Sequence, residues 1–567
     1  MPSVLWKALS AARDLGRLQR IASVLIRYGF SDVVRRVGLA GVLEQAGRAL
    51  HWKAADELAR LEPPVRVRRA LEDLGPTCIK LGQMLATRLD LFPPEWIAEF
   101  EKLQDQAPSV PFEEIQKQLR EDLGAEPEEV FSELASAPLA AASIAQVHCA
   151  RLRDGSEVVV KVRRPGIRPQ VEADLRLLER LAGIAVEDFP ELARFRPREV
   201  VRQFTLSLRR ELDLAAECRN AERIARNCRD HPEIVIPRVY WEWTGERVNV
   251  QEAITGIPGR DMEAAERAGL DRKTLARHGA QAMLRMILED GFFHADPHPG
   301  NFFYLPGNRI ALIDFGMIGR LSEDRRGQVV DMLQGLVGRD ADKVTDILLI
   351  WAADADADIS RDSLRQEIDV FIDQYHGVAL KNIELRIILA ELTALLRDHH
   401  LALPPDLMLL AKALISLEGM GRQLDPDFDV AAESAPFLRR AILSRYTPDA
   451  MLKRGWQAAV DGIDVLAGLP RDLRQLLRTI RGSGLKVHVD VTRLQHATNQ
   501  MDNAASRLTM GVVLAALIVG SAIVTTIDRG PVLLGLPLFG LLGFAGAAVS
   551  GVWLLVSILR SGRTPRG

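Results

Sequence analysis

The sequence predicts a two-lobed α+β fold, and three segments support this prediction. Residues 294–301 read His-Ala-Asp-Pro-His-Pro-Gly-Asn, which gives Asp296 and Asn301 the spacing of the kinase catalytic loop H-R-D-x-x-x-x-N. Residues 314–316 read Asp-Phe-Gly and follow the strand-like run 309–313. Upstream, the apolar run Val158-Val-Val-Lys161 ends in a single lysine. In this order the three segments predict an atypical protein-kinase-like fold.

These segments carry the residues that phosphoryl transfer needs. The reaction requires a carboxylate near the acceptor and two oxygen ligands that hold Mg²⁺ against the phosphates of ATP. Asp296 is the candidate catalytic residue, and Asn301 and Asp314 are the candidate Mg²⁺ ligands. Lys161 has the position of the lysine that pairs with the phosphates of ATP or ADP. A chance loop and an ordinary edge-strand lysine are the alternatives, and the spacing argues against both.

A carboxylate is needed to orient Lys161, and Glu217 is the best candidate. It lies in a segment, Val200 to Arg226, that the sequence predicts to be one helix. Glu211 and Asp213 are predicted on the same helix. Because charged helix faces are usually only solvated, Glu211 stays open as an alternative partner.

The expected nucleotide loop is unusual. Residues 139–146 read Leu-Ala-Ala-Ala-Ser-Ile-Ala-Gln where a protein kinase carries G-x-G-x-x-G. Alanine permits close approach of the backbone to phosphates but resists the positive φ that glycine adopts, so a stiffer loop is expected. Ser143 and Gln146 are its predicted polar contacts; a small-residue turn between strands is the alternative. The predicted nucleotide-binding residues are Ala140, Ala141, Ala142, Ser143, Gln146, Lys161 and Glu217.

An earlier block, Lys80-Leu-Gly82-Gln83, lies in a predicted helix. Pro76 suits the first turn of this helix, and residues 92–94, Phe-Pro-Pro, end it. By itself Lys80 would be read as a solvated helical lysine.

Together the Lys-x-Gly-Gln block, the alanine-rich loop and residues 294–301 resemble the UbiB family of atypical kinases. By motif the resemblance covers residues 60–330, and by architecture it extends to the C-terminus. It implies that Glu211 and Asp213 hold Lys80 and Gln83 over the active site, so that an N-terminal helical extension covers the place of a peptide substrate. This favours ATP hydrolysis or small-molecule chemistry over protein phosphorylation. The predicted regulatory residues are Lys80, Gly82, Gln83, Glu211 and Asp213.

Composition narrows the class of protein. The chain has 567 residues and a net charge of −3, so no nucleic-acid partner is expected. Its four cysteines show no C-x-x-C pattern, which favours reduced thiols in a cytoplasmic-type compartment.

The C-terminal region predicts a transmembrane helical hairpin. Residues 508–527 and 531–559 are uncharged, and each run is long enough to span a bilayer. Arginines flank the outer ends, so the positive-inside rule places the kinase-like body in the cytoplasm. A buried pair of soluble helices is the alternative. Residues 1–30 lack the apolar core of a cleavable signal peptide. The Ala- and Arg-rich composition, the missing long presequence and the usual layout of the UbiB family favour a bacterial protein in the plasma (inner) membrane, and an organellar origin stays open.

The predicted domains follow from these segments. They are an N-terminal helical extension (1–110), an N-lobe (111–256), a helical C-lobe (257–445), a juxtamembrane helical region (446–507) and two transmembrane helices (508–559). Residues 471–481 form a basic amphipathic pattern that indicates either a membrane-surface helix or an ordinary lobe helix. In the C-lobe, helices are predicted over 326–336, 341–351, 364–375, 383–398 and 405–420.

The predicted function is a membrane-anchored atypical kinase or ATPase that supports ubiquinone (coenzyme Q) biosynthesis, with ATP/ADP and Mg²⁺ as cofactors. ATP hydrolysis coupled to the handling of hydrophobic quinone precursors is expected. Membrane lipids, quinone precursors and other ubiquinone biosynthesis proteins are the expected partners. The alternatives are a small-molecule or protein kinase, a pseudokinase scaffold, and a ring hydroxylase, for which the sequence shows no metal triad or flavin fingerprint. The acceptor and the oligomeric state stay open, a dimer included.

Overall fold

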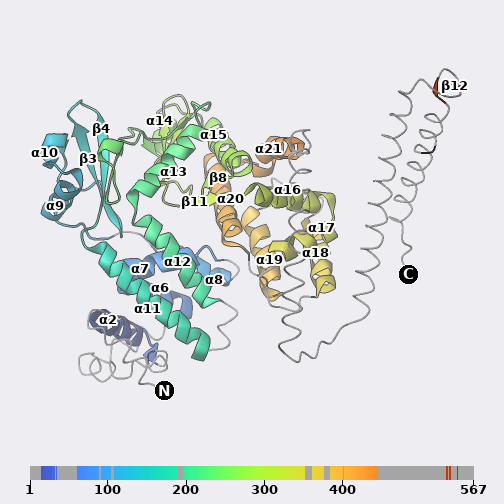
Figure 1. The fold of residues 1–567 in the computed structure, drawn as a ribbon, viewed down its shortest axis with the longest axis horizontal. Helices are drawn as coiled ribbons and strands as arrows, with labels where there is room; N and C mark the ends of the chain where they lie inside the picture. The colour runs from blue at the N-terminus through green and yellow to red at the C-terminus, as the bar shows by residue number, and fades with distance from the viewer. Residues whose placement is uncertain are drawn as a thin grey trace. The chain divides into compact units, whose positions relative to one another are not determined.

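The computed structural model shows two compact units, residues 1–452 and 453–567. It describes residues 15–31, 34, 61–88, 91–103, 107–188, 196–351, 360–375, 384–399, 401, 403–444, 532–533, 536–537 and 546. In the first unit a β-sheet lobe, a helical lobe and a group of N-terminal helices are distinct (Figure 1). The α+β prediction is confirmed for this unit.

The N-lobe sheet is antiparallel, in the order β1 (Phe131–Leu134), β3 (Ala145–Leu152), β4 (Glu157–Arg163) and β6 (Val248–Glu252), with β2 (Ala140–Ala141) paired to β3. Helix α9 (Phe112–Leu123) covers one face, where Ile115 and Leu119 pack on Val160 and Val250. Side chains alternate between the two faces of a strand. The register Val147↔Lys161↔Asn249 therefore places Lys161 on the opposite face.

Three α-helices are described between β4 and β6: α11 (Ile167–Asp188), α12 (Pro197–Glu211) and α13 (Leu214–Asn227). The prediction of one helix from Val200 to Arg226 is wrong, because the helix is interrupted at residues 212–213. Asp213 caps α13 by accepting a hydrogen bond from the backbone N–H of Ala215 (3.1 Å). Such a cap satisfies an amide that has no partner within the helix.

The N-terminal helices described are α2 (Leu15–Arg27), α6 (Pro63–Leu74), α7 (Pro76–Leu85) and α8 (Pro94–Phe100). They pack on α11 and α12, and an ion pair of 2.5 Å between Arg17 and Asp174 joins α2 to α11. Gly82 lets α7 pack closely, since a Cβ there would lie 2.2 Å from a methyl carbon of Leu103. Gly82 thus has a packing role in addition to the regulatory one predicted for it.

The C-lobe surrounds a core built on α15 (Arg272–Arg285), which continues as the π-helix η3 (Met286–Asp290). A second sheet has the order β5 (Ile234–Val235), β10 (Arg309–Leu312), β9 (Phe302–Leu305) and β7 (Ile257–Pro258). The predicted helices of this lobe are found with small shifts of their ends. The remaining helices are α10 (Pro127–Val130), η2 (Trp241–Trp243), α14 (Met262–Arg267), α16 (Glu323–Gly338), α17 (Ala341–Trp351), α18 (Arg361–Tyr375), α19 (Leu385–Asp398), α20 (Pro405–Leu424) and α21 (Val430–Ser444).

Most of the second unit, with the predicted amphipathic segment 471–481, lies outside the described residues. Among the residues that are described, none of the helices combines the length and the apolar character needed to cross a bilayer. Strands β12 (Val532–Leu533) and β13 (Leu536–Pro537) pair antiparallel. The second predicted transmembrane helix is therefore wrong at these four residues, where Pro531 and Pro537 disfavour a helix interior. Gly546, within the second predicted span, is helical, and the other residues of the hairpin prediction are not described.

Candidate functional site

The catalytic loop and the Asp-Phe-Gly segment are held together by backbone hydrogen bonds. Strand β8 (Phe292–His294) leads into the loop and pairs with β11 (Ile318–Arg320), which follows Asp-Phe-Gly. The N–H of Ala295 donates to the carbonyl of Met317, and the N–H of Ile313 donates to that of Asn301, each at 3.0 Å. Phe315 is 1% exposed, and its ring lies 5.8 Å from that of His294. The two segments therefore form one rigid corner.

Two side chains of this corner present oxygen atoms suited to Mg²⁺. The amide nitrogen of Asn301 donates to the backbone carbonyl of Asp296 (3.0 Å), which leaves its side-chain oxygen to bind a cation. The Oδ1 atom of Asp314 accepts from the N–H of Gly316 (2.8 Å), which leaves Oδ2. Carboxylate and amide oxygens are ligands that Mg²⁺ accepts, so this donor set fits Mg²⁺ with nucleotide phosphates completing its coordination.

The surrounding charges keep Asp314 ionised. Burial opposes the charged carboxylate, but nearby Lys161, the N–H of Gly316, His294 and Lys80 outweigh burial and hold the pKa of Asp314 below its usual range. An ionised carboxylate is the form that binds a metal ion.

Lys161 and Glu217 form a half-buried ion pair. The Nζ atom of Lys161 lies 2.7 and 3.0 Å from the two carboxylate oxygens of Glu217, in the first turn of α13. Burial acts to lower the pKa of Lys161, but the carboxylates of Glu217 and Asp314 outweigh burial and raise it above its usual value. Glu217, not Glu211, is thus the carboxylate that contacts Lys161.

Glu211 contacts Lys80 instead, at 2.5 Å, and so joins the end of α12 to α7. Gln83 donates to the backbone carbonyl of Leu103 (3.0 Å), and Asp213 pairs with Arg219 (2.8 Å) in addition to capping α13. The expectation that Glu211 and Asp213 together hold both Lys80 and Gln83 therefore needs correction. Asp213 instead caps α13 and pairs with Arg219.

The alanine-rich loop is a tight turn between β2 and β3. The N–H of Ala142 donates to the carbonyl of Ala145 (2.9 Å), and Arg164 donates to the carbonyl of Ala142 (2.7 Å). The N–H of Ala107 donates to the carbonyl of Ala141 (3.3 Å). These bonds fix the loop in addition to the restriction that alanine imposes. Ser143, at 2% exposure, is buried rather than presented on the surface.

Gln146 was predicted as a polar contact for the nucleotide, and this is wrong. Its amide accepts from the backbone N–H of Val110 (2.9 Å) and lies 3.0 Å from a ring nitrogen of His148, and the side chain is fully buried. Gln146 shares a strand face with His148, whose ring stacks near Phe112 of α9. Alternation along β3 therefore directs Gln146 away from the face of Lys161.

His294 is buried and takes part in loop geometry. Its Nδ1 atom accepts from the N–H of Asp296 (3.1 Å), which requires the proton to be on the other ring nitrogen. Burial lowers the pKa of His294, although the carboxylates of Asp314 and Asp296 act in the opposite direction. The neutral ring therefore fixes the backbone that carries the candidate catalytic carboxylate.

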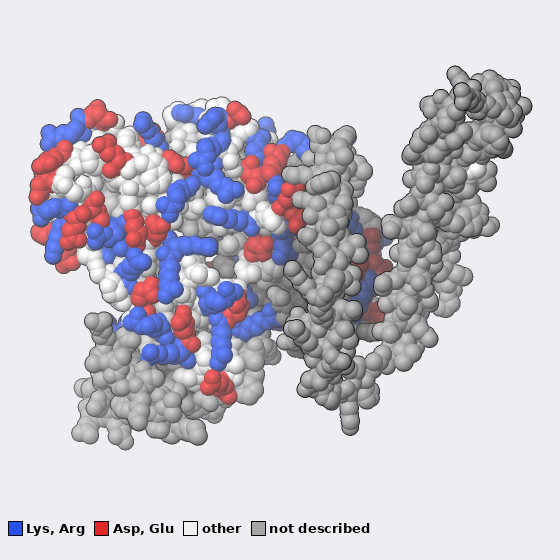
Figure 2. Space-filling model, viewed as in Figure 1, with Lys and Arg blue, Asp and Glu red and all other residues white. Residues whose placement is uncertain are grey.

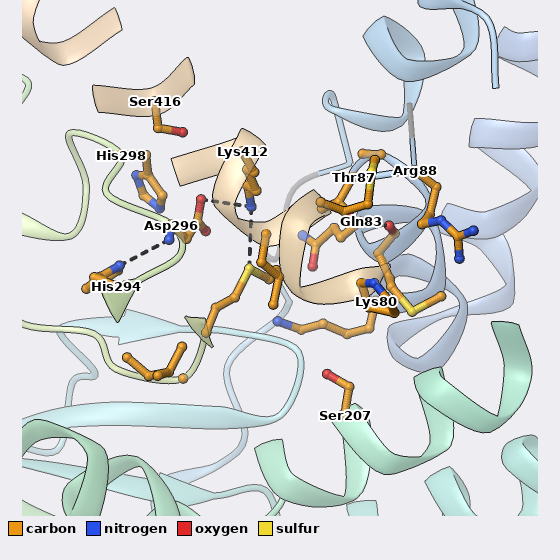
Figure 3. Close-up of a pocket in the computed structure, with 18 of the residues that line it drawn as sticks. Lys80, Gln83, Thr87, Arg88, Ser207, His294, Asp296, His298, Lys412 and Ser416 are labelled. Atoms are coloured by element: carbon orange, nitrogen blue, oxygen red, sulfur yellow. Dashed lines mark hydrogen bonds and ion pairs between the residues drawn. The ribbon is translucent and has the colours of Figure 1, made fainter. Parts of the chain in front are cut away.

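One charged contact was not predicted from the sequence. Lys412 of α20 points at Asp296, and its Nζ atom lies 2.9 Å from Oδ1 of that carboxylate (Figure 3). The same ammonium lies 3.6 Å from the sulfur of Met317. No local motif surrounds Lys412, so its place in the site follows only from the tertiary fold.

A cavity of about 1900 Å³ joins these residues to an apolar region. Asp296, Asn301, Asp314, Glu217 and Lys80 line its polar end. Helices α7, α8, α12, α19 and α20 supply much of the remaining wall. The apolar lining includes Met84, Ile97, Leu206, Met408, Leu409 and Ile415.

Basic side chains gather around the outside of this region. Figure 2 shows many Lys and Arg side chains across the face formed by α12 and α13, with acidic side chains among them, and Arg209 and Arg219 form ion pairs there with Glu172 and Asp213. The arginines of these helices that also line the cavity are Arg209, Arg210, Arg219, Arg223 and Arg226. This face suits an anionic surface or ligand.

Comparisons with known proteins agree with this architecture. Residues 102–348 match the ABC1 atypical kinase-like domain, residues 368–429 the UbiB helical domain, and residues 492–560 the ABC1/UbiB kinase-like C-terminal domain. A Pseudomonas paraeruginosa protein named "Probable protein kinase UbiB" is 36% identical over 467 residues, covering 81% of this chain and 87% of its own length. The chain belongs to the UbiB family.

A second relative is consistent with this UbiB membership. A Marinobacter nauticus protein, also named "Probable protein kinase UbiB", is 33% identical over 539 residues and covers 94% of this chain and 98% of its own length. The structure of the Mycobacterium tuberculosis protein Rv3197 with erythromycin aligns with a TM-score of 0.44 and 25% identity, covering 69% of this chain and 97% of that one. The match of residues 102–348 to the ABC1 atypical kinase-like domain confirms the kinase-like fold expected from the motifs. The UbiB helical domain match contains Lys412.

Proposed function

We propose that this UbiB-family protein binds Mg²⁺–ATP between its lobes and hydrolyses it, and that hydrolysis supports ubiquinone biosynthesis at the bacterial inner membrane. The observation that carries the proposal is the Lys161–Glu217 ion pair beside a half-buried, ionised Asp314. A charged lysine and an ionised aspartate on facing elements are the pair that phosphates and Mg²⁺ require. Withdrawing these charges from water is costly, and such charges gather at functional sites, which supports this proposal.

Each residue of the site has a proposed role. Lys161 would hold the nucleotide phosphates, with Glu217 fixing the lysine. Asn301 and Asp314 would hold Mg²⁺, which supplies charge neutralisation between the phosphates. Asp296 would accept the proton of the attacking nucleophile. The turn at Ala140–Ala142 would lie over the phosphates.

The wall of the cavity supports water or a small molecule as the acceptor rather than a protein segment. Helices α7 and α8 line the region next to Asp296, and the Lys80–Glu211 pair fastens α7 to α12. An extended peptide would have to displace these helices. The apolar lining suits a hydrophobic ligand with a polar head, such as a quinone precursor. ATP hydrolysis would then change how this ligand is held or presented.

Residues 508–527 and 538–559 are proposed to anchor the protein as a transmembrane hairpin, with strands β12 and β13 in the connection between them. Two uncharged runs of spanning length and the flanking arginines support this proposal. The basic face of α12 and α13 would then favour contact with anionic lipid headgroups. Membrane pelleting of the intact protein, compared with a variant that lacks 508–559, tests the anchor.

Phosphate release tests the catalytic proposal. Full-length protein would be assayed with ATP and Mg²⁺, on liposomes with and without a short-chain phenol that mimics a quinone precursor. Asp314→Asn is expected to abolish phosphate release and the Mg²⁺-dependent part of ATP-induced thermal stabilisation. The matched control is Asp346→Asn, an exposed aspartate on α17 that pairs with Arg361. Wild-type protein that binds ATP but releases no phosphate would favour a scaffold, and a phosphorylated product would favour a kinase.

A further inference from the structure

Lys412 reaches the candidate active site from outside the kinase-like segment of the chain. Its helix, α20, is held by buried residues that flank the lysine, such as Leu410 and Ala413. The side chains of Lys412 and Asp296 are 29% and 28% exposed, so their 2.9 Å contact is partly shielded from solvent. Because α20 is anchored by its own core contacts, the fold positions this ammonium without depending on the ion pair.

The catalytic loop itself lacks a cation. Residues 294–301 contain no Lys or Arg, although phosphoryl transfer spreads negative charge over the oxygens of the moving group. Lys161 is paired with Glu217 and Lys80 with Glu211. Lys412 instead contacts Asp296 itself, with Nζ 2.9 Å from Oδ1, so it brings a positive charge to the candidate catalytic carboxylate from another element.

The hydrogen-bonding capacity of Lys412 is not used up by its contacts. An ammonium group carries three hydrogens. One faces Oδ1 of Asp296, and the sulfur of Met317, at 3.6 Å, is a weak acceptor. Lys412 can therefore hold the carboxylate and still donate a strong hydrogen bond to a phosphoryl oxygen.

We propose that Lys412 is a catalytic residue, which donates to the transferred phosphoryl group while it orients Asp296. The inference rests on the proposed ATP hydrolysis. In that reaction the water oxygen bonds to the γ-phosphorus as the bond from this phosphorus to the β,γ-bridging oxygen breaks. Asp296 accepts the proton of the water, and ADP leaves with the bridging oxygen and its electron pair. Lys412 neutralises charge on the phosphoryl oxygens and is unchanged at the end.

A purely structural role for Lys412 makes a different prediction. If the lysine only joined α20 to the catalytic loop, its loss would lower the stability of the protein and would weaken the binding of all nucleotides to the same extent. A catalytic cation acts on the transition state more strongly than on bound substrate. The ADP–AlF₄⁻ complex mimics that transition state, so comparing it with ADP separates the two roles.

The test uses full-length protein and three variants: Lys412→Met, Lys412→Arg and the control Lys343→Met. Lys343, on α17, is similarly half-buried and pairs with Asp331 (3.2 Å). Lys412→Met is expected to lower kcat by about 100-fold, in the range for removal of a donor to developing charge, with KM for ATP changed by less than about threefold. Affinity for ADP–AlF₄⁻ should fall in parallel while affinity for ADP is retained. Lys412→Arg should recover part of kcat, and Lys343→Met should match wild type.

Two results would overturn the inference while phosphate release by the wild type upholds the proposed function. One is a Lys412→Met variant whose kcat stays within threefold of wild type. The other is an equal loss of affinity for ADP and ADP–AlF₄⁻ together with a lower melting temperature, which would assign Lys412 a structural role. Absence of phosphate release by the wild type itself would instead overturn the proposed function on which the inference depends.

Discussion

Glu211 and Glu217 lie on successive helices and pair with different lysines. Glu211, the last residue of α12, contacts Lys80 of α7, whereas Glu217, in the first turn of α13, contacts Lys161 of β4. The Asp213 cap between them starts α13 in a new direction. Two carboxylates that a single helix would have made interchangeable candidates are thereby given separate partners.

Neutralising these two carboxylates should therefore have different effects on nucleotide binding. Glu217→Gln is expected to weaken Mg²⁺–ATP binding about tenfold, because Lys161 loses the charge that orients it. A tenfold change corresponds to about 1.4 kcal/mol of binding free energy. Glu211→Gln should change the affinity by less than about threefold, since Glu211 contacts Lys80 and not Lys161. Isothermal titration with a non-hydrolysable ATP analogue measures both. Equal losses in the two variants would contradict the separation of roles.

Glycine in the nucleotide loop should raise ATP affinity or autophosphorylation. Ala140 and Ala141 form β2, and the turn that follows is fixed by hydrogen bonds at Ala142. Ala140→Gly or Ala141→Gly adds the backbone freedom that phosphate-binding loops use. The control is Ala137→Gly, an exposed position just before the loop. ATP and ADP affinities and autophosphorylation are the measurements, and variants that match wild type in all three would show that the loop is not limiting.

Cys149 should be the thiol that reacts in the native protein. Cys78, Cys218 and Cys228 are buried, and burial raises the pKa of these thiols to about 12, 12 and 11, respectively. Cys149 is exposed, and it shares a face of β3 with Val147, the strand partner of Lys161. Maleimide labelling followed by mass spectrometry should find one modified thiol.

Bound nucleotide should slow this labelling, because Cys149 lies on the same face of the sheet as Lys161, the proposed phosphate-binding lysine. Cys149→Ser is the control and should remove the labelling without changing the fold. Labelling at an equal rate with and without Mg²⁺–ADP would place the nucleotide away from this face.

His294 should make the fold less stable at acidic pH. Burial holds the pKa of its ring below the ordinary value of 6.5, so the unfolded chain binds this proton more readily than the folded one. Well above pH 6.5 the ring is neutral in both the folded and the unfolded chain, so it does not change the pH dependence of stability. As the pH falls through 6.5, the unfolded chain takes up the proton first, and the free energy of unfolding decreases. Chemical unfolding of wild type and His294→Gln at pH 8.0 and 5.5 measures the difference. The variant should lose less stability on acidification than wild type, and parallel losses would refute the assignment.

Local patterns predicted the parts of the site that depend on short segments. The strand ending in Lys161, the catalytic loop and the Asp-Phe-Gly segment each have a signature within a few residues. Gln146 was misassigned because its face depends on the register of β3 with β4. That signal was present in the sequence, since the Asp154-Gly155 turn fixes this hairpin and alternation then separates Gln146 from Lys161.

Other features could not be read from local patterns. The helix break before α13 was visible only as an aspartate that could equally sit on a helix surface. Lys412 had no signal, because a lysine on an amphipathic helix is ordinarily solvated and its contact with Asp296 arises from packing of distant segments. Sequence patterns identify site residues that lie close together in one segment. Contacts with charged residues from distant segments depend on how the helices pack.

The backbone bonds on either side of Asp-Phe-Gly restrict which inhibitors could suit this protein. Some kinase ligands need the phenylalanine of this segment to leave its pocket, and the packing of that residue distinguishes active from inactive states. Here such a movement would break the Ala295–Met317 and Ile313–Asn301 hydrogen bonds and uncover the ring of Phe315. Compounds of that kind should bind poorly, and selective ligands are better sought in the neighbouring apolar cavity, where occupancy requires no rearrangement of the backbone.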